Sequence, residues 1–375
     1  MAGLEIPVEV GAEFIHGEAE ATHALLRQAG IAAIDSTREQ RHLERGRLKR
    51  GSAFAEAQRA VQHAAGLERD MSFQAFLARR RLSRKTKALA RMMVQGFDAA
   101  DPARVSARSI VEEWGEGGSL GASQPRPQGG YGALFDWLAE SVVAAGARLQ
   151  LDSPVHAVQW KHGTVLVRGS ASGRPFAFRA RHAIVTLPLG VLQSNAVRFS
   201  PSLTMKGPAL GKLASGPVIR VAMRFHSPFW QARAPEVAFF HVPEAPFPTF
   251  WTPLPMRAPL LTAWAGGPKA ARLSGSSRDK LVAAALRSVA MVFPEEKPRQ
   301  QLGSVFAQDW QAEPYSRGGY SYVRVGGAGA RERLAEPIED TLYFAGEATD
   351  AEEAGTVAGA LRSGQRAARQ ILRSS

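Results

Sequence analysis

The pattern of residues 341–372 constrains the fold more than any other part of this sequence. The apolar run 342–344 lies between a threonine and Gly346, which is typical of a strand buried on both faces. Glu347 follows at the carboxyl end of this strand, and from Gly355 onward apolar residues recur at helical spacing, with arginines on the other face. A strand, a glycine turn, an acidic residue and a helix in this order predict an α/β fold, in which ligands bind at the carboxyl ends of the strands.

The start of this terminal helix is a candidate ligand site. The first amide N–H groups of a helix have no partner within it and carry a partial positive charge, so an electron-rich oxygen, such as the carbonyl of a reduced flavin, is stabilised there. Gly359 and Gly364 each cost about 1 kcal/mol relative to alanine inside a helix, which indicates close packing against a sheet or a ring. The alternatives are an ordinary core helix with small residues and, for Glu347, a surface or capping glutamate.

The composition bounds the class of protein. With 375 residues, of which 45% are apolar, the chain can build two domains with a real core. The absence of cysteine excludes disulfides, thiolate metal sites and a cysteinyl link to a cofactor, and no other metal motif is present. The sequence contains no apolar run of membrane-spanning length and does not begin like a signal peptide. We therefore expect a soluble, cytoplasmic protein without a membrane partner.

The net charge of +13 raises the question of an acidic partner. Part of the excess lies in residues 79–91, and such basic runs can bind nucleic acid or acidic membranes. No aromatic residues alternate with these charges, as base stacking requires. A solvated helix face is therefore the preferred interpretation, and nucleic-acid binding is the weaker alternative.

Helical and strand-rich segments alternate along the chain. Residues 18–95 are predicted to be mostly helical, and further helices are predicted over 133–145 and 278–292. Alternating or apolar short runs predict strands over residues 148–151, 155–160, 165–167, 176–178, 183–187, 218–225, 237–241, 249–251 and 260–264. We predict two interleaved domains: one formed by residues 1–17, 129–190 and 318–375, the other by residues 18–128 and 191–317.

An ordered set of motifs resembles the flavin-containing amine oxidases, the family of monoamine oxidases, polyamine oxidases and flavin-type lysine demethylases. The resemblance covers nearly the whole chain. The motifs that carry it are, in chain order, residues 11–17, 129–132, 154–160, 184–192, 199–201, 228–230, 264–267, 310–320 and the terminal strand and helix.

The resemblance implies a cofactor, a fold and a reaction. The cofactor is FAD, and the fold is mixed α/β (α+β), with an FAD/NAD(P)-binding-like domain interleaved with a substrate domain of mixed sheet and helices. The reaction is oxidation of an amine carbon–nitrogen bond: a hydride equivalent passes to flavin N5, the imine hydrolyses, and oxygen reoxidises the flavin with formation of H2O2. A small-molecule amine, with polyamines as one class, is the expected substrate. The oligomeric state is left open.

The resemblance also assigns site residues. Four are expected beside the reacting groups: His16, Arg220, Trp310 and Tyr320. Tyr320 would be one half of an aromatic cage that binds the amine through its π face, and core packing is the alternative for both aromatic residues. The residues expected to contact FAD are Gly11, Ala12, Glu13, Val155, Thr186, Trp310, Gly346, Glu347, Gly355, Thr356 and Val357.

The first departure from the family is the missing GxGxxG strand–turn–helix, because the chain begins roughly where that unit ends. The glycine-rich segment 115–121 follows no predicted strand, so it is no substitute. Without this turn the pyrophosphate loses a helix N-terminus. We therefore predict an N-terminally truncated nucleotide-binding domain that binds FAD weakly or not at all, unless a separate polypeptide supplies the unit.

Three further departures concern single residues. Arg220 stands where the family carries a lysine that holds a water near flavin N5, with Arg224 as the alternative position, and arginine cannot readily lose its proton. Gly319 stands at the position of covalent attachment, so any flavin must be noncovalent. Thr356 replaces the second cage aromatic, and His16 stands where polyamine-oxidising members carry a polar residue, which together favour a longer or more polar amine. The rival hypotheses are a flavin-free binding module and a fragment that needs a separate nucleotide-binding unit.

Overall fold

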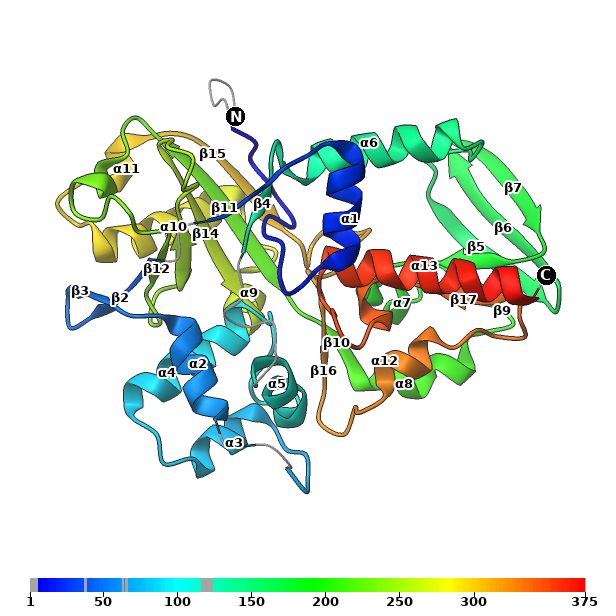
Figure 1. Ribbon diagram of the computed structural model, residues 1–375, viewed down its shortest axis with the longest axis horizontal. Coiled ribbons are helices and arrows are strands. Elements are labelled where there is room, and N and C mark those ends of the chain that lie inside the picture. Colours follow the sequence, from blue (N-terminus) through cyan, green and yellow to red (C-terminus); the bar gives the residue numbers. More distant parts are fainter. Residues whose placement is uncertain (1–5, 37–38, 63, 65–66, 116–123, 375) are drawn as a thin grey trace.

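The computed structural model describes residues 6–36, 39–62, 64, 67–115 and 124–374. They form a mixed α/β molecule with two lobes (Figure 1). One lobe contains a large sheet with helices packed around it, and the other contains a smaller sheet, a parallel strand pair and the long terminal helix. Among these residues, no helix combines the length and the apolar character that a bilayer crossing requires.

The large sheet of the first lobe has seven strands in the order β15-β11-β14-β13-β12-β2-β3. All neighbours are antiparallel except β12 and β2, which run parallel. Helix α10 (Arg278–Val292) packs on the sheet and encloses the main apolar core with it. The strands are β2 (Gln40–Glu44), β3 (Arg47–Arg50), β11 (Val218–Phe225), β12 (Phe239–His241), β13 (Thr249–Trp251), β14 (Leu260–Gly266) and β15 (Leu302–Asp309). The strands and the helix predicted over residues 218–292 are confirmed.

The prediction that residues 18–95 are mostly helical is only partly confirmed. Helices α1 (Glu20–Ala29), α2 (Ala53–Val61), α3 (Phe73–Arg79) and α4 (Arg84–Gly96) form as expected, and α5 (Ala107–Trp114) follows them. Residues 40–50 form the hairpin β2–β3 instead, because Arg45 and Gly46 both adopt the positive φ that a tight hairpin turn needs. The polar side chains of these strands concealed them in the sequence, since their partner β12 lies far along the chain.

The second lobe contains the four-stranded sheet β7-β6-β5-β9 and the parallel pair β17–β8. Strand β17 is fully buried and leads through Gly346 into the terminal helix α13, as the sequence predicts. The predicted strand over residues 148–151 does not form: these residues are exposed and pair with no strand of the described chain. The elements of this lobe are α6 (Gly130–Ala144), β5 (Val155–Lys161), β6 (Thr164–Ala171), β7 (Arg174–Ala180), β8 (Ala183–Val185), β9 (Arg198–Ser200), β17 (Leu342–Phe344) and α13 (Val357–Ser374).

The remaining elements are short and lie within the two lobes or between them. Strands β10 and β16 pair with each other, as do β1 and β4. These short elements are β1 (Ala33–Ile34), β4 (Arg126–Pro127), α7 (Leu189–Gln193), η1 (Thr204–Lys206), α8 (Gly207–Lys212), β10 (Leu213–Ser215), η2 (Phe229–Ala232), α9 (Gly267–Leu273), α11 (Pro298–Gln301), β16 (Ser321–Val323), α12 (Ala330–Ala335) and η3 (Glu347–Thr349).

Candidate functional site

A cavity of about 1180 Å³ is lined by residues from both lobes. Its walls come from residues 11–19, the end of α4, helix α5, the strands β11 and β14, and the start of α13. Most of the site residues predicted from the sequence meet here: Gly11, Ala12, Glu13, His16, Arg220, Trp310, Tyr320, Glu347, Gly355, Thr356 and Val357. The tertiary structure therefore assembles one site from segments more than 300 positions apart in the chain.

Three predicted residues lie outside this cavity: Val155, Thr186 and Gly346. Val155 begins β5 and packs beside an apolar cluster, and Thr186 is exposed just after β8. Gly346 has a φ of 118° and donates its N–H to the Ser363 hydroxyl at 2.8 Å. Its role here is the turn between β17 and η3, and the nucleotide contacts of all three residues stay predictions.

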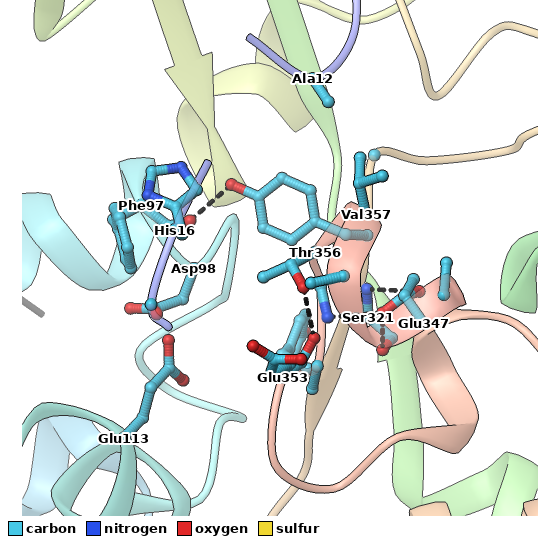
Figure 2. Close-up of a pocket in the computed structure, with 18 of the residues that line it drawn as sticks. Ala12, His16, Phe97, Asp98, Glu113, Ser321, Glu347, Glu353, Thr356 and Val357 are labelled. Carbon is cyan, nitrogen blue, oxygen red and sulfur yellow. Dashed lines mark hydrogen bonds between the residues drawn. The ribbon is translucent and has the colours of Figure 1, made fainter. Parts of the chain in front are cut away.

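Glu347 holds the loop that leads into α13 (Figure 2). Its carboxylate accepts hydrogen bonds from the Ser321 amide at 3.2 Å, the Ser321 hydroxyl at 2.7 Å and the Gly355 amide at 2.9 Å. Thr356 donates its hydroxyl to the Glu353 carbonyl at 2.7 Å and accepts from the Gly359 amide at 3.0 Å. The two side chains thus position the first turn of the terminal helix.

The start of α13 faces the cavity with free donors. No acceptor in the described part of the chain binds the amide N–H groups of Val357 and Ala358. The prediction of close packing is confirmed at Gly359, where a Cβ would stand 2.1 Å from the Glu353 carbonyl oxygen. It is wrong at Gly364, where nothing lies within 4 Å. The packing partner is a backbone loop rather than a sheet.

The two predicted aromatic residues form part of the cavity wall. Tyr320 donates its hydroxyl to the Phe97 carbonyl at 2.5 Å, and its ring lies against Gly355. Burial raises the pKa of Tyr320 well above its ordinary value, and nearby carboxylates add to this effect. Trp310 donates its indole N–H to the Val10 carbonyl at 2.9 Å. Both rings are therefore fixed in place by backbone acceptors.

Arg220, not Arg224, reaches the cavity, and it is buried in an ionic cluster. It donates to the Gly11 carbonyl at 3.0 Å and pairs with the Glu13 carboxylate. Arg126 binds the same carboxylate at 2.7 Å, and the Trp251 indole N–H lies 3.1 Å from both of its oxygens. Burial raises the pKa of Glu13, but the charges and hydrogen bonds of Arg220 and Arg126 outweigh burial and lower it.

Sequence reasoning missed Arg126 and Trp251 in this cluster. Neither residue belongs to a motif, and Arg126 is separated from Glu13 by 113 positions. No local pattern could have paired them, because the contact exists only once β4 and the large sheet come together.

A second acidic cluster was also missed. Asp98 lines the cavity with only 6% of its surface exposed, and its neighbours there are the side chains of Glu113 and Trp114. Figure 2 shows its carboxylate directed toward that of Glu113 on α5. Burial and the charge of Glu113 raise the pKa of Asp98 well above its ordinary value. Ionisation of a buried carboxyl group beside a second carboxylate is costly, and a nearby positive charge lowers that cost, so this pair is suited to a positive ligand.

His16 lies on the other side of Asp98 in the same wall (Figure 2). Its ring meets Phe97 edge-on, with 5.2 Å between centroids. Burial lowers the pKa of His16 to about 4, so the imidazole is neutral at physiological pH. The negative charge of the acidic pair is therefore not neutralised by this histidine.

Comparison with known proteins assigns this geometry to a family. The family model described as flavin containing amine oxidoreductase matches residues 3–372. Lysine-specific histone demethylase 2 of Homo sapiens is 30% identical over 251 residues, which cover 64% of this chain and 29% of the demethylase. The peroxisomal N(1)-acetyl-spermine/spermidine oxidase of Bos taurus is 28% identical over 260 residues, which cover 59% of this chain and 50% of the oxidase. The chain thus spans half or less of the length of these relatives.

Solved structures share the fold. Putrescine oxidase bound to putrescine superposes with a TM-score of 0.79 at 20% identity, and the match covers 98% of this chain and 88% of that chain. Cyclohexylamine oxidase from Brevibacterium oxydans superposes with a TM-score of 0.76 at 19% identity. The mixed α/β fold and the family resemblance predicted from the sequence are therefore confirmed.

Proposed function

This chain belongs to the flavin containing amine oxidoreductase family, and from that premise we propose that it oxidises a carbon–nitrogen bond of an amine that carries a second positive charge. FAD, when bound, supplies the oxidant that accepts a hydride equivalent from the carbon next to the nitrogen. The observation that carries the choice of substrate is the buried carboxyl group of Asp98, which faces the carboxyl group of Glu113 in the shared cavity.

The cavity fits the ring end of such a cofactor. Free amide N–H groups at the start of an 18-residue helix favour an electron-rich oxygen, and Gly355, with a φ of 71°, allows close approach to the backbone. Trp310, Tyr320 and Val357 supply flat or apolar walls. For the nucleotide end, no glycine-rich strand–helix turn is found in the described part of the chain. The residues present therefore fit the ring, which they would hold noncovalently.

The acidic pair explains why a second cation would bind. Asp98 is buried and Glu113 is exposed on the cavity side, and two carboxylates this close share a proton when nothing positive lies between them, because like charges raise their pKa values. A protonated amine between Asp98 and Glu113 would donate a charge-assisted hydrogen bond to each carboxylate, and its positive charge would offset their mutual repulsion. A substrate with a single amine cannot place one nitrogen between Asp98 and Glu113 and a second nitrogen at the start of α13, where the reaction would occur.

Different residues of the cavity would then contact different parts of the substrate. Tyr320 and Thr356 flank the start of α13, where the reacting nitrogen would lie uncharged against the π face of the ring. His16 remains neutral and accepts or donates a hydrogen bond without adding charge. Relatives of this chain are named for acetylated spermine and spermidine and for putrescine, amines with more than one nitrogen, which agrees with this division.

The test compares putrescine with butylamine, which has the same carbon chain and one nitrogen fewer. With FAD-reconstituted protein we expect kcat/KM for putrescine to exceed that for butylamine at least about tenfold, the effect of one charge-assisted contact. Asp98→Asn should abolish that preference and leave butylamine turnover unchanged. An unchanged ratio in this variant would refute the substrate assignment. Peroxide formed in step with amine loss would support oxygen as the acceptor.

A flavin-free binding module is the second candidate. Arg220 favours it, because this arginine stands where the family carries a lysine and is paired with Glu13 rather than free to hold a water beside a flavin ring. This candidate predicts that protein as isolated shows no visible flavin absorbance and produces no peroxide with any amine, while putrescine still binds the acidic pair. Tightly bound FAD in protein as isolated would exclude it.

A further inference from the structure

The positive charge of this chain is concentrated in one part of the first lobe. Residues 39–91 contain fourteen basic and five acidic side chains, which together supply +9 of the net charge of +13. The sequence alone favours a solvated face for residues 79–91, because it shows only this one basic segment. The structure adds a second segment, the hairpin β2–β3, whose exposed basic residues are Arg45, Arg47, Lys49 and Arg50.

Contacts between neighbouring elements join the two basic segments. Lys85, at the start of α4, pairs with the Glu56 carboxylate of α2 at 3.7 Å. Its ammonium group would lie 3.9 Å from a Cβ placed at Gly51, the residue after β3. Arg80, directly after α3, donates to the Gln62 carbonyl directly after α2, at 2.5 Å. Residues 39–59 and 79–91 therefore form one continuous surface, the basic face, at the lower left of Figure 1.

Much of the charge on the basic face is not compensated. The glutamates there already have partners: Glu39 pairs with Arg41 and Arg50, and Glu44 pairs with Lys49. Within the described part of the chain, six exposed arginines of the face form no ion pair: Arg45, Arg47, Arg79, Arg81, Arg84 and Arg91. Because like charges repel one another, such a face is suited to an anionic partner.

The apolar surroundings narrow the class of partner. None of the exposed large apolar side chains of the described chain lies in residues 39–96. Peripheral membrane binding normally adds the insertion of apolar side chains, and a protein interface has an apolar core. Single-stranded nucleic acid needs exposed aromatic rings for stacking. The basic face offers charge alone, so these three partners fit it poorly.

A DNA duplex needs only charge from its partner. Its phosphates form a dense row of negative groups, and their neutralisation by basic side chains is enough for binding. Eleven of the fourteen basic residues in 39–91 are arginines, whose guanidinium group can bind a phosphate through two parallel hydrogen bonds. The face also extends over several elements, which suits a long polyanion better than a single phosphate ion.

We propose that the basic face binds double-stranded DNA through its phosphate backbone, without reading the base sequence. The arginines of the hairpin β2–β3 and those of residues 79–91 contact the same duplex. None of the six unpaired arginines lines the cavity, so DNA binding uses a surface separate from the proposed reaction. This inference stands whether or not an amine is oxidised.

The experiment measures binding of the purified 375-residue chain to a short fluorescent DNA duplex of arbitrary sequence, by anisotropy, over a series of salt concentrations. We expect log Kd to rise linearly with log salt concentration, with a slope of about 0.9 for each phosphate contact. A fourfold variant should lower this slope by about 3–4 and weaken binding at least about tenfold at low salt. Its changes are Arg45→Gln, Arg47→Gln, Arg84→Gln and Arg91→Gln.

All four side chains are exposed, so the fourfold variant should fold, which its circular dichroism and thermal transition check. The double variant Arg45→Gln with Arg47→Gln tests the hairpin by itself and should lower the slope about half as much. The matched control removes four exposed arginines of the other lobe that form no described ion pair, and should leave slope and affinity nearly unchanged. Its changes are Arg174→Gln, Arg179→Gln, Arg181→Gln and Arg198→Gln.

Four outcomes would overturn the proposal. The first is a Kd that does not depend on salt, and the second is a hairpin variant that binds like the wild type. The third is an equal loss of affinity in the control and the fourfold variant, which would show attraction by net charge alone. The fourth is tighter binding to phosphatidylglycerol vesicles than to the duplex, which would assign the face to a membrane. None of these readouts needs FAD or an amine.

Discussion

Two buried carboxyl groups of this protein, those of Glu13 and Asp98, differ in whether positive charges compensate them. Glu13 is held by two guanidinium groups and an indole N–H, so its charge is compensated. Asp98 has no positively charged partner within the described residues and faces a second carboxylate. A compensated group contributes structure, whereas an uncompensated one costs stability until a ligand arrives. The same residue type thus has a structural role at one wall of the cavity and a binding role at another.

Removing the Glu13 charge should be strongly destabilising. Glu13→Gln leaves the buried guanidinium groups of Arg220 and Arg126 without a counter-charge, which costs about 3–5 kcal/mol. The matched control is Glu236→Gln, which removes the exposed pair with Arg257 and should cost less than about 1 kcal/mol. Denaturant unfolding measures both changes, and equal losses in the two variants would contradict the buried role of Glu13.

Asp98 should make the stability of the ligand-free protein pH-dependent. Its folded pKa lies above the ordinary value of 3.8, so the folded state binds the proton more tightly than the unfolded state. Stability therefore falls as pH rises from that ordinary value toward the raised pKa, and stays lower above it. Asp98→Asn should remove this dependence and stabilise the protein by about 1–3 kcal/mol at neutral pH.

The measurement for Asp98 is denaturant unfolding across a pH series, with Asp136→Asn on the exposed side of α6 as the control. The Asp136 variant should follow the wild-type curve. Parallel curves for wild type and Asp98→Asn would show that the buried carboxylate does not hold a proton, and the acidic pair would then need another explanation.

At the scale of elements, the start of α13 depends both on the local sequence pattern and on contacts with residues distant in the chain. The strand, the turn and the helix were all predicted, and Glu347 proved to fasten the loop between them through Ser321 and Gly355. Two glycines in this helix look alike in the sequence and differ in their surroundings. Alanine substitutions at Gly359 and Gly364 can therefore test this difference in surroundings through their effects on stability.

Gly359→Ala should destabilise the protein by about 1–3 kcal/mol, because the new methyl group would meet the Glu353 carbonyl and force the loop to shift. Gly364→Ala should instead stabilise it by about 1 kcal/mol, since alanine is the better helix former and the site is open. Thermal unfolding of the two variants tests both signs. If Gly364→Ala is as damaging as Gly359→Ala, the packing described for this helix is wrong.

At the scale of the whole molecule, the described residues of the cavity between the lobes would hold the ring end of a flavin and offer no glycine-rich turn to its nucleotide end. If only the ring is held, riboflavin should stabilise the chain nearly as well as FAD, because the adenosine half gains no contact. At a ligand concentration of 100 times Kd, binding to the folded state adds about 2.7 kcal/mol. Thermal shifts measured over a series of riboflavin and FAD concentrations give the two affinities. A much higher affinity for FAD would show that this chain contacts the nucleotide by itself.

The sequence alone determined the terminal strand and helix, the ordered motifs and hence the family. These follow from side-chain periodicity and from turn residues, which act over a few positions of the chain. Only the tertiary structure decided that the buried Asp98 faces Glu113, that Arg126 and Trp251 join Glu13, and that residues 148–151 form no strand. The physical reason is that burial, compensating charge and strand pairing depend on partners distant in the chain, so the same local pattern has a different outcome when its neighbour is present or missing.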